Sequence, residues 1–278
     1  MSHNRQKKIA VINDFCGFGR CSIAASLPII SALKIQCCPL PTSIFSNHTG
    51  FESFYYTDYT THMNRYMQEW EKLDLRFHGI LTGFLGSPEQ IRIVKSFFER
   101  FKTDSNITVI DPVMGDYGRL YPTYSPRLAE QMCSLVPYAD ILTPNLTEAC
   151  ILTETAYDPD MDEARLETLC QKLSAMGPKK VVISGLSRGE DLENFIYEEG
   201  NQPHIVREHK VGPCRSGTGD VFASIIAAEA VNGKDLTSAV HHASSFIAKV
   251  LRRTVEMGLP DTDGICFEEY LTEIQKEA

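Results

Sequence analysis

The 278-residue sequence lacks the features that mark several common classes of protein. It has no apolar run long enough to cross a bilayer, and its first eight residues are polar, unlike a signal peptide. Lysine and arginine number 27 against 36 acidic residues, and the resulting net charge of −9 argues against a basic nucleic-acid-binding surface. We therefore expect a cytoplasmic protein that binds neither nucleic acid nor membrane.

Familiar phosphate-binding and cysteine motifs are also absent. There is no G-x-x-x-x-G-K-[ST] loop, and no G-x-G-x-x-G follows the first predicted strand. The nine cysteines are odd in number, irregularly spaced and without a C-x-x-C pair, so we expect reduced, mostly buried thiols. Any phosphate site in this acidic chain must therefore be local, built from backbone N–H groups, a few cations or a metal.

Strand and helix patterns alternate along the chain, which predicts an α/β fold with a mostly parallel central sheet flanked by helices. No linker or repeat interrupts residues 1–278, so we expect a single domain. The apolar runs predict strands at 8–12, 79–83, 107–110, 140–143 and 180–184, and a hairpin across 194–208. The helical patterns cover 22–33, 88–101, 126–136, 162–176, 218–231, 236–251 and 267–276.

Two stretches depart from this alternation. Residues 36–44 contain Pro39 and Pro41, which a central strand does not tolerate, so an edge or irregular strand is expected. Residues 45–61 are polar and aromatic with few helix signals, and we interpret them as a loop or flap.

The most informative string is Ser-Gly-Thr-Gly-Asp at residues 216–220, followed directly by an apolar helix pattern. A helix start carries unpaired N–H groups and partial positive charge that attract phosphate, and Gly217 and Gly219 allow close backbone approach. Asp220 would stand beside such an anion, where a carboxylate suits proton abstraction from an attacking hydroxyl. The alternative is a plain N-cap built from Thr218 or Asp220, and the string taken alone favours it.

Other polar residues fall where predicted strands end, at the edge where α/β sheets bind ligands. They are Asn13, Asp14, Asp111, Thr143, Asn145 and Ser184. Asp111, Asp116 and Glu148 could hold a hydrated Mg²⁺ through carboxylates. The pair Asn145 and Glu148 could equally form a helix capping box, an interpretation slightly favoured for that pair alone.

In combination these strings resemble the ribokinase-like kinases. The Gly217–Asp220 loop is similar to their anion hole and base, while Asp-Pro-Val-Met-Gly-Asp at 111–116 and Thr-Pro-Asn-Leu-Thr-Glu at 143–148 resemble the vitamin-kinase branch. Phe-Ser-Asn-His-Thr-Gly at 45–50 closely resembles the substrate-side segment of pyridoxal kinases. The resemblance covers residues 8–250 and implies a three-layer ribokinase-like fold.

The resemblance implies ATP-dependent phosphorylation of the 5′-hydroxymethyl group of pyridoxal, pyridoxine or pyridoxamine. Asp220 would be the base, and the N–H groups of Gly217, Thr218 and Gly219 would stabilise the transferring phosphoryl group. The same resemblance implies that Asp111 and Glu148 bind Mg²⁺ and that Asn145 lies near the nucleotide phosphates. It places a monovalent cation such as K⁺, or a phosphate, at Thr143 and Ser184. The pocket for the vitamer ring would be formed by Phe45, His48, Thr49 and Phe84. Phe45 and Phe84 could instead be core residues, and His48 a hydrogen-bonded loop residue.

Tyr117 and Tyr121 belong to a segment, residues 115–121, that resembles the part of these kinases that closes over ATP. Relatives are often dimers, so we expect a homodimer. Asp220 is aspartate where some relatives carry cysteine, so their aldehyde-trapping variant is not indicated.

Asp14 is a departure, because pyridoxal kinases commonly have serine after the first strand, near the pyridine nitrogen. A carboxylate there would favour a protonated ring nitrogen through a charge-assisted hydrogen bond. The alternative is that Asp14 only caps the turn at residues 15–17.

Three competing functions remain at this point. A hydroxymethylpyrimidine kinase of the same fold is the first, although the string at 45–50 argues against it. A sugar or nucleoside kinase is the second, and it would carry a Gly-Gly pair that is missing near the first strands. The third is a non-catalytic protein that binds a B6 vitamer.

Overall fold

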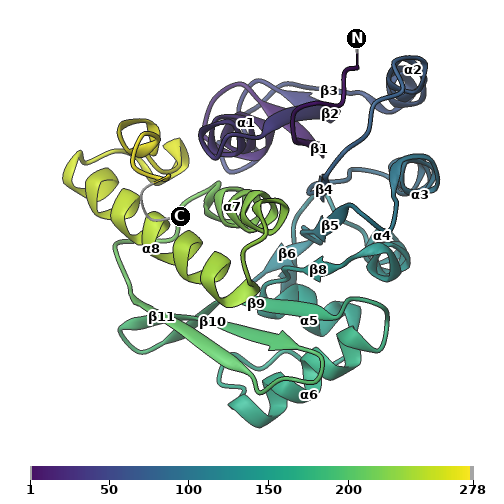
Figure 1. Ribbon diagram of the computed structural model, residues 1–278. Coiled ribbons are helices and arrows are strands. Elements are labelled where there is room, and N and C mark those ends of the chain that lie inside the picture. Colours follow the sequence, from purple (N-terminus) through teal and green to yellow (C-terminus); the bar gives the residue numbers. More distant parts are fainter. Residues whose placement is uncertain (1, 276–278) are drawn as a thin grey trace.

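A nine-stranded sheet organises the protein, as a computed structural model describing residues 2–275 shows (Figure 1). The strands pair in the order β11 (His204–His209), β10 (Asp191–Glu198), β9 (Lys180–Arg188), β8 (Ile141–Leu142), β5 (Ile107–Ile110), β4 (Gly79–Thr82), β1 (Lys8–Cys16), β2 (Gln36–Phe45) and β3 (Tyr56–Asp58). The six strands from β9 to β2 are parallel, and the two at one edge and one at the other are antiparallel. The predicted mostly parallel sheet is confirmed.

Helices cover both faces of the sheet and enclose two separate cores (Figure 1). One face carries α1 (Ser22–Ala32), α7 (Thr218–Asn232) and α8 (Leu236–Glu256). The other carries α2 (Thr60–Lys72), α3 (Pro88–Phe101), α4 (Pro126–Met132), α5 (Leu146–Leu152) and α6 (Glu163–Ser174). β1 is buried along nearly its whole length, as expected for a strand between two helical layers.

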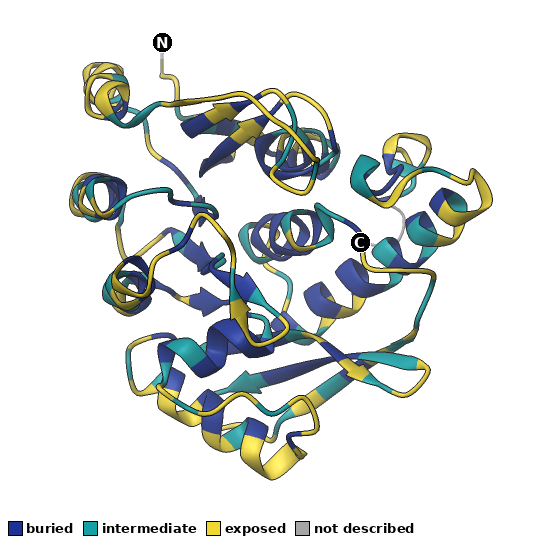
Figure 2. Cartoon of the chain, turned by 180° about the vertical axis from the view of Figure 1, so that it is seen from behind, coloured by how far each residue is buried: buried dark blue, intermediate teal, exposed yellow. Residues whose placement is uncertain are grey.

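Helix α7 has an unbroken buried run from Val221 to Glu229 (Figure 2). It packs between α1 and α8, which explains its nearly uniform apolar sequence. Its N-terminus is thereby fixed in place against the ends of β1 and β4. No helix among the described residues is long and apolar enough to span a membrane.

The two irregular stretches come out partly as expected. β2 is a continuous ten-residue strand despite its prolines. It tolerates them because β3 pairs only with its last three residues, so that Gln36 to Thr42 form an open edge. The segment 45–61 is largely loop, but it includes β3 and leads into α2.

Two helix predictions need correction. Helix α2 was not predicted, although Met63, Met67 and Trp70 follow helical spacing and pack into the core. The helix expected at 267–276 is wrong within the described residues, where the 3₁₀ turn η3 (Glu268–Tyr270) is followed only by turns. Its apolar residues Phe267 and Ile274 are buried without a continuous helix.

The remaining elements are short. The hairpin β6 (Gly115–Asp116) and β7 (Arg119–Leu120) projects from the end of β5, and the 3₁₀ segments are η1 (Cys133–Tyr138) and η2 (Asp261–Asp263). The predicted helix 126–136 therefore ends early as α4 and continues as η1, which contains Pro137. All nine cysteines are free thiols, six of them are buried, and Cys214 is exposed.

Candidate active site

A cavity of about 890 Å³ opens at the carboxyl ends of the parallel strands. It lies beside β1 and β4, where the chain changes direction across the sheet, the usual ligand position in such folds. The cavity wall includes every site residue predicted from the sequence: Asp14, Phe45, His48, Thr49, Phe84, Asp111, Thr143, Asn145, Glu148, Ser184, Gly217, Thr218, Gly219 and Asp220.

The loop that begins α7 has a backbone that only glycine suits at one position. Gly217 is left-handed, with φ of 83°, and a Cβ there would lie 2.0 Å from the carbonyl oxygen of Arg20. Gly219 differs, because a Cβ at that residue would meet no protein atom within 4 Å. Gly217 is therefore required by the fold itself, whereas Gly219 leaves open space in front of the helix N-terminus.

Asp220 lies in the first turn of α7 and does not cap it. The N-cap is Gly217, with no side-chain cap bond, and the hydroxyl of Thr218 donates instead to the carbonyl of Arg215 at 3.1 Å. The N-cap interpretation is therefore wrong for both residues. Nδ2 of Asn13 donates to Oδ1 of Asp220 at 3.0 Å, and the neighbouring backbone N–H of Ser22 also lowers the pKa of this carboxyl. Burial raises the pKa of Asp220 despite these donors, which makes it a stronger base.

Asn13 links this base to the neighbouring strand end. Its Oδ1 accepts from the backbone N–H of Asp14 at 2.9 Å and of Phe84 at 2.8 Å, while its Nδ2 contacts Asp220. Asn13 thus joins β1, β4 and α7. Asp14 itself is buried, and burial raises its pKa to about 7, with a further increase from the charge of Asp220. The neighbouring Ser22 side chain favours the charged form of Asp14 and partly offsets this rise in pKa.

Aromatic side chains form the wall next to Asp14. Phe45 and Phe84 meet edge to face with ring centroids 6.2 Å apart, and Phe45 stacks on Tyr56 at 5.1 Å. These rings supply a flat apolar surface suited to an aromatic ligand.

His48 lines the cavity and is also a hydrogen-bonded loop residue. Its Nδ1 accepts from the N–H of Gly50 at 3.1 Å, so Nε2 carries the proton and donates to the carbonyl of Thr262 at 2.7 Å. Both ring nitrogens are therefore engaged by the protein. His48 ties the loop at 45–50 to the C-terminal segment.

Asn145 and Glu148 form the capping box of α5. The Glu148 carboxylate accepts from the N–H of Asn145 at 2.9 Å and of Met114 at 3.0 Å, and Oδ1 of Asn145 accepts from the N–H of Glu148 at 3.0 Å. Burial raises the pKa of Glu148 to about 8. Burial and the nearby Glu148 also raise the pKa of Asp111 well above its usual range.

The carboxylates of Asp111 and Glu148 suit a Mg²⁺ ion whose remaining coordination positions are filled by water and by a bound phosphate compound. Both are hard oxygen donors on the cavity wall, and no cluster of three or more His, Cys, Asp or Glu able to enclose a metal occurs within residues 2–275. Mg²⁺ commonly binds one or two carboxylates and completes its shell with water and phosphate oxygens. A cation would also offset the repulsion from Glu148 that, after burial, raises the pKa of Asp111.

The hairpin β6–β7 lines one part of the cavity with Asp116 and Tyr117. Tyr117 at the hairpin tip has φ of 50°, and its hydroxyl interacts with the thiol of Cys214 closely enough to lower the pKa of that thiol, against the larger effect of burial. The N–H of Gly118 donates to the hydroxyl of Thr147 at 2.8 Å, and Nδ2 of Asn145 donates to the carbonyl of Gly115 at 2.8 Å. The hairpin is thus anchored on α5, and its tip lies near Cys214 in the loop that precedes Gly217.

Two residues with important contacts were not predicted. Ser22 lies near Asp14 and Asp220 and lowers the pKa of both, and its φ of 56° cannot be read from a sequence. Arg215 is buried and donates to the carbonyls of Leu259 at 2.9 Å and Pro260 at 2.7 Å. Neither residue lies in a motif that distinguishes it from ordinary helix or loop positions.

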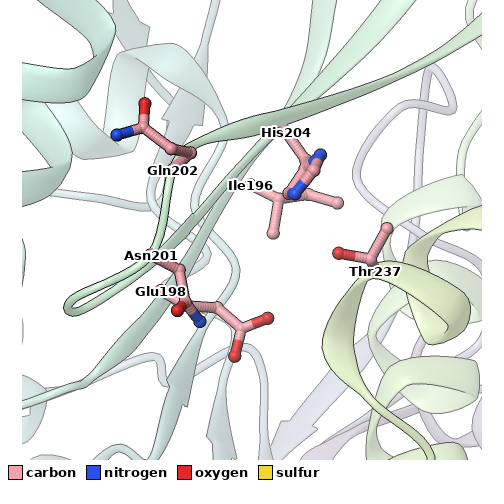
Figure 3. A pocket seen from close by; sticks show the side chains of 6 residues that line it. All are labelled: Ile196, Glu198, Asn201, Gln202, His204 and Thr237. Atoms are coloured by element: carbon pink, nitrogen blue, oxygen red, sulfur yellow. The ribbon is translucent and has the colours of Figure 1, made fainter.

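A second pocket of about 230 Å³ lies between the β10–β11 hairpin and the first turn of α8 (Figure 3). Thr237 comes from the helix, and the other lining residues come from the hairpin: Ile196, Glu198, Asn201, Gln202 and His204. None of the predicted site residues lines it, so the larger cavity is the candidate active site.

Comparison with known proteins identifies relatives of this architecture. Residues 19–263 match the family model described as phosphomethylpyrimidine kinase. A pyridoxal kinase of Arabidopsis thaliana is 31% identical over 229 residues, covering 78% of this chain and 72% of that protein. A hydroxymethylpyrimidine/phosphomethylpyrimidine kinase of Staphylococcus aureus is 28% identical over 210 residues, covering 71% of this chain and 73% of that protein.

Solved structures agree with this result. A candidate phosphomethylpyrimidine kinase from Bacteroides thetaiotaomicron, crystallised with pyridoxal, superposes with a TM-score of 0.94 at 35% identity. The match covers 97% of this chain and 96% of that chain. The similarity therefore extends over the whole sheet and both helical layers.

Proposed function

The chain belongs to the phosphomethylpyrimidine kinase family, as a kinase of the ribokinase-like superfamily related to pyridoxal kinases, and we propose that it phosphorylates the 5′-hydroxymethyl group of a B6 vitamer with ATP. The observation that carries this proposal is the position of Asp220. Its carboxylate lies at the N-terminus of α7, in the same cavity as an aromatic wall and a second acidic residue, Asp14.

In the proposed reaction Asp220 takes the proton of the substrate hydroxyl. The hydroxyl oxygen forms a bond to the γ-phosphorus of ATP, the bond from that phosphorus to the β,γ-bridging oxygen breaks, and ADP leaves. Burial raises the pKa of Asp220, which strengthens it as a base. Asn13 holds the carboxylate in place at 3.0 Å.

The N–H groups of Gly217, Thr218 and Gly219 would stabilise the charge on the transferring phosphoryl group. The open space before Gly219 and the partial positive charge of the α7 N-terminus favour a phosphate there. Asn145 lies at the same end of the cavity, under the β6–β7 hairpin, and would contact the nucleotide phosphates.

Asp111 and Glu148 would hold Mg²⁺, which would neutralise charge on the phosphate oxygens when bound. Thr143 and Ser184 lie on the same wall, where K⁺ or another monovalent cation, or a nucleotide phosphate, would bind. We also propose that the chain forms a homodimer, as related kinases often do.

The vitamer ring would lie against Phe45 and Phe84, with His48 and Thr49 at the rim. Asp14 would accept a hydrogen bond from the protonated ring nitrogen, which would shift the preference among vitamers and their protonation states. Asp14→Ser tests this role. Vitamer ratios of kcat/KM that stay the same across pH in this variant would contradict it.

Hydroxymethylpyrimidine is the second candidate substrate, favoured by the family match and by the Staphylococcus aureus relative. The test is ADP release from Mg·ATP with pyridoxal, pyridoxine, pyridoxamine and hydroxymethylpyrimidine. We expect turnover of a B6 vitamer, reduced about 10²- to 10⁴-fold in Asp220→Ala. Turnover of the pyrimidine alone would select the second candidate, and tight vitamer binding without ADP formation would indicate a binding protein.

A further inference from the structure

The segment 259–263 follows α8 and lies beside the N-terminal part of the chain (yellow beside purple in Figure 1). Four of its five backbone carbonyls accept hydrogen bonds from side chains of other loops. Two of these bonds come from Arg215: Nη2 donates to the carbonyl of Leu259 at 2.9 Å, and Nη1 donates to the carbonyl of Pro260 at 2.7 Å. Arg215 directly precedes the glycine loop that contains Gly217, so these bonds attach that loop to the segment.

The other two bonds come from loops that follow β1 and β2. Nε2 of His48 donates to the carbonyl of Thr262 at 2.7 Å, and Nη1 of Arg20 donates to the carbonyl of Asp263 at 3.0 Å. His48 lines the cavity in the loop 45–50, and Arg20 lies in the turn between β1 and α1. One short segment therefore holds both the loop 45–50 and the glycine loop, and both loops line the cavity.

The turn between β1 and α1 is packed between the segment and the glycine loop. On one side, Gly264 has φ of 77°, and a Cβ there would lie 2.4 Å from the carbonyl oxygen of Gly19. On the other side, a Cβ at Gly217 would lie 2.0 Å from the carbonyl oxygen of Arg20. The backbones are in close contact on both sides, so a displacement of the segment would also move the N-terminus of α7.

Arg215 is the only arginine among the described residues that is buried. Its side chain is 4% exposed, and its only ion-pair partner within residues 2–275 is Asp261 at 3.2 Å, which is 57% exposed. A buried charge lowers the free energy of unfolding unless it is well paired, so stability alone does not favour arginine here. A guanidinium can, however, donate to two carbonyls at once in a fixed geometry.

We propose that Arg215 is a positioning residue, which acts through the segment 259–263 to hold the glycine loop in a fixed position relative to His48 and the loop 45–50. In the proposed reaction this arrangement keeps the substrate hydroxyl aligned with the γ-phosphate of ATP. The effect on catalysis rests on the proposed function, whereas the mechanical coupling of the two loops does not.

The first test is hydrogen–deuterium exchange of the free protein, followed by mass spectrometry. Arg215→Lys keeps the charge but loses the two-nitrogen fork, and His48→Phe keeps a ring but cannot donate. We expect each variant to speed amide exchange about tenfold in both loops, 45–50 and 211–219, because the same segment holds them. His48→Gln, which retains a side-chain N–H donor, should restore slow exchange in both.

Two controls separate this coupling from a loss of stability. Arg253→Lys is the matched substitution, because Nε of Arg253 binds Glu269 at 2.9 Å in the same C-terminal region without contacting either loop. It should leave exchange in both loops unchanged. Amides of the buried strand β5 report global unfolding and should exchange at the wild-type rate in every variant. Faster exchange confined to the loop that carries the substitution, or an equal increase in β5, would overturn the proposal.

The second test is steady-state kinetics with ATP and the preferred vitamer. We expect kcat of Arg215→Lys to fall about tenfold, with KM for either substrate changing less than about threefold, because both substrates still bind but are misaligned. Adding His48→Phe should lower kcat little further, since both substitutions break the same link. Fully additive losses would contradict the coupling. A failure of the proposed function would appear separately, as a lack of vitamer turnover by the wild-type protein.

Discussion

Buried carboxylates of this protein fall into two groups with different partners. In the scaffold, Glu229 lies between α7 and α8, 2.5 Å from Nδ1 of His242 and 3.6 Å from Nζ of Lys234. Glu193 in β10 lies 2.5 Å from Nη2 of Arg207. Each scaffold carboxylate is therefore balanced within the fold by basic side chains.

The cavity carboxylates lack such partners. Within the described part of the chain, none of them makes an ion pair with a basic side chain, and burial raises the pKa of each: Asp14, Asp111, Glu148 and Asp220. Their hydrogen-bond donors are backbone N–H groups at Glu148 and the side-chain amide of Asn13 at Asp220. The scaffold carboxylates thus have basic partners within the fold. The cavity carboxylates have none, so a cationic group of a ligand would stabilise their charged forms.

The largest loss of activity is expected from substitution of the glycines at the start of α7. Gly217→Ala places a Cβ against the carbonyl of Arg20 and forces φ away from 83°, so the N–H donors move. We expect kcat to fall about 10²- to 10³-fold. Gly219→Ala is the matched control for the fold. The added Cβ at residue 219 would meet no protein atom, so the unfolding midpoint in urea should not fall. It would occupy the space in front of the helix N-terminus, so KM for ATP should rise. Equal loss of stability in both variants would contradict the distinction between the two glycines.

Asp14 should make stability depend on pH in a characteristic direction. Its pKa rises from 3.8 unfolded to about 7 folded, so the folded state retains a proton that the unfolded state loses between these values. The free energy of unfolding therefore falls as pH rises from about 4 to about 7, by at most about 4 kcal/mol. Urea unfolding of Asp14→Asn across this window should show a smaller decrease, because Asp111, Glu148 and Asp220 still contribute in the same direction. The exposed Asp104→Asn should retain the full decrease.

Neutralising one carboxylate from each group should change stability in opposite directions. Glu229→Gln removes the charge that balances His242 and Lys234, and should lower the free energy of unfolding by about 1–3 kcal/mol. Asp111→Asn removes a buried, repelled charge and should leave stability equal or higher while activity falls. Urea unfolding at pH 7.5 gives both values. A clear fall in the free energy of unfolding of Asp111→Asn would contradict the view that the cavity carboxylates, unlike the scaffold carboxylates, do not stabilise the fold.

The smallest effect on activity is expected from substitutions in the β6–β7 hairpin. Tyr117→Phe removes the hydroxyl that interacts with the thiol of Cys214 and should raise KM for ATP by about two- to tenfold with little change in stability. Cys214→Ala, which removes the other partner, should have a similar effect, and the double variant should add little. Fully additive effects would show that the two side chains act independently.

Much of the fold was predictable because its signals are local. β-branched runs ending at Asp111 or Asn145 located strand ends, and Ser87 before Pro88 correctly marked the start of α3. Helix α2 was missed because the aromatic, polar segment before it hid its start. The final turns were predicted as a helix because apolar spacing alone does not reveal where a chain lacks continuous hydrogen bonding.

The sequence by itself determined the layered fold, the edge of the sheet that carries the site, and the glycine loop with Asp220, because hydrophobic periodicity and turn chemistry act between neighbours in the chain. Only the tertiary structure decided the partners of those residues. Asn13 reaches Asp220 across 207 positions, and His48 reaches Thr262 across 214. Such bonds depend on strand order and helix packing, and the same packing buries the cavity carboxylates and raises their pKa values.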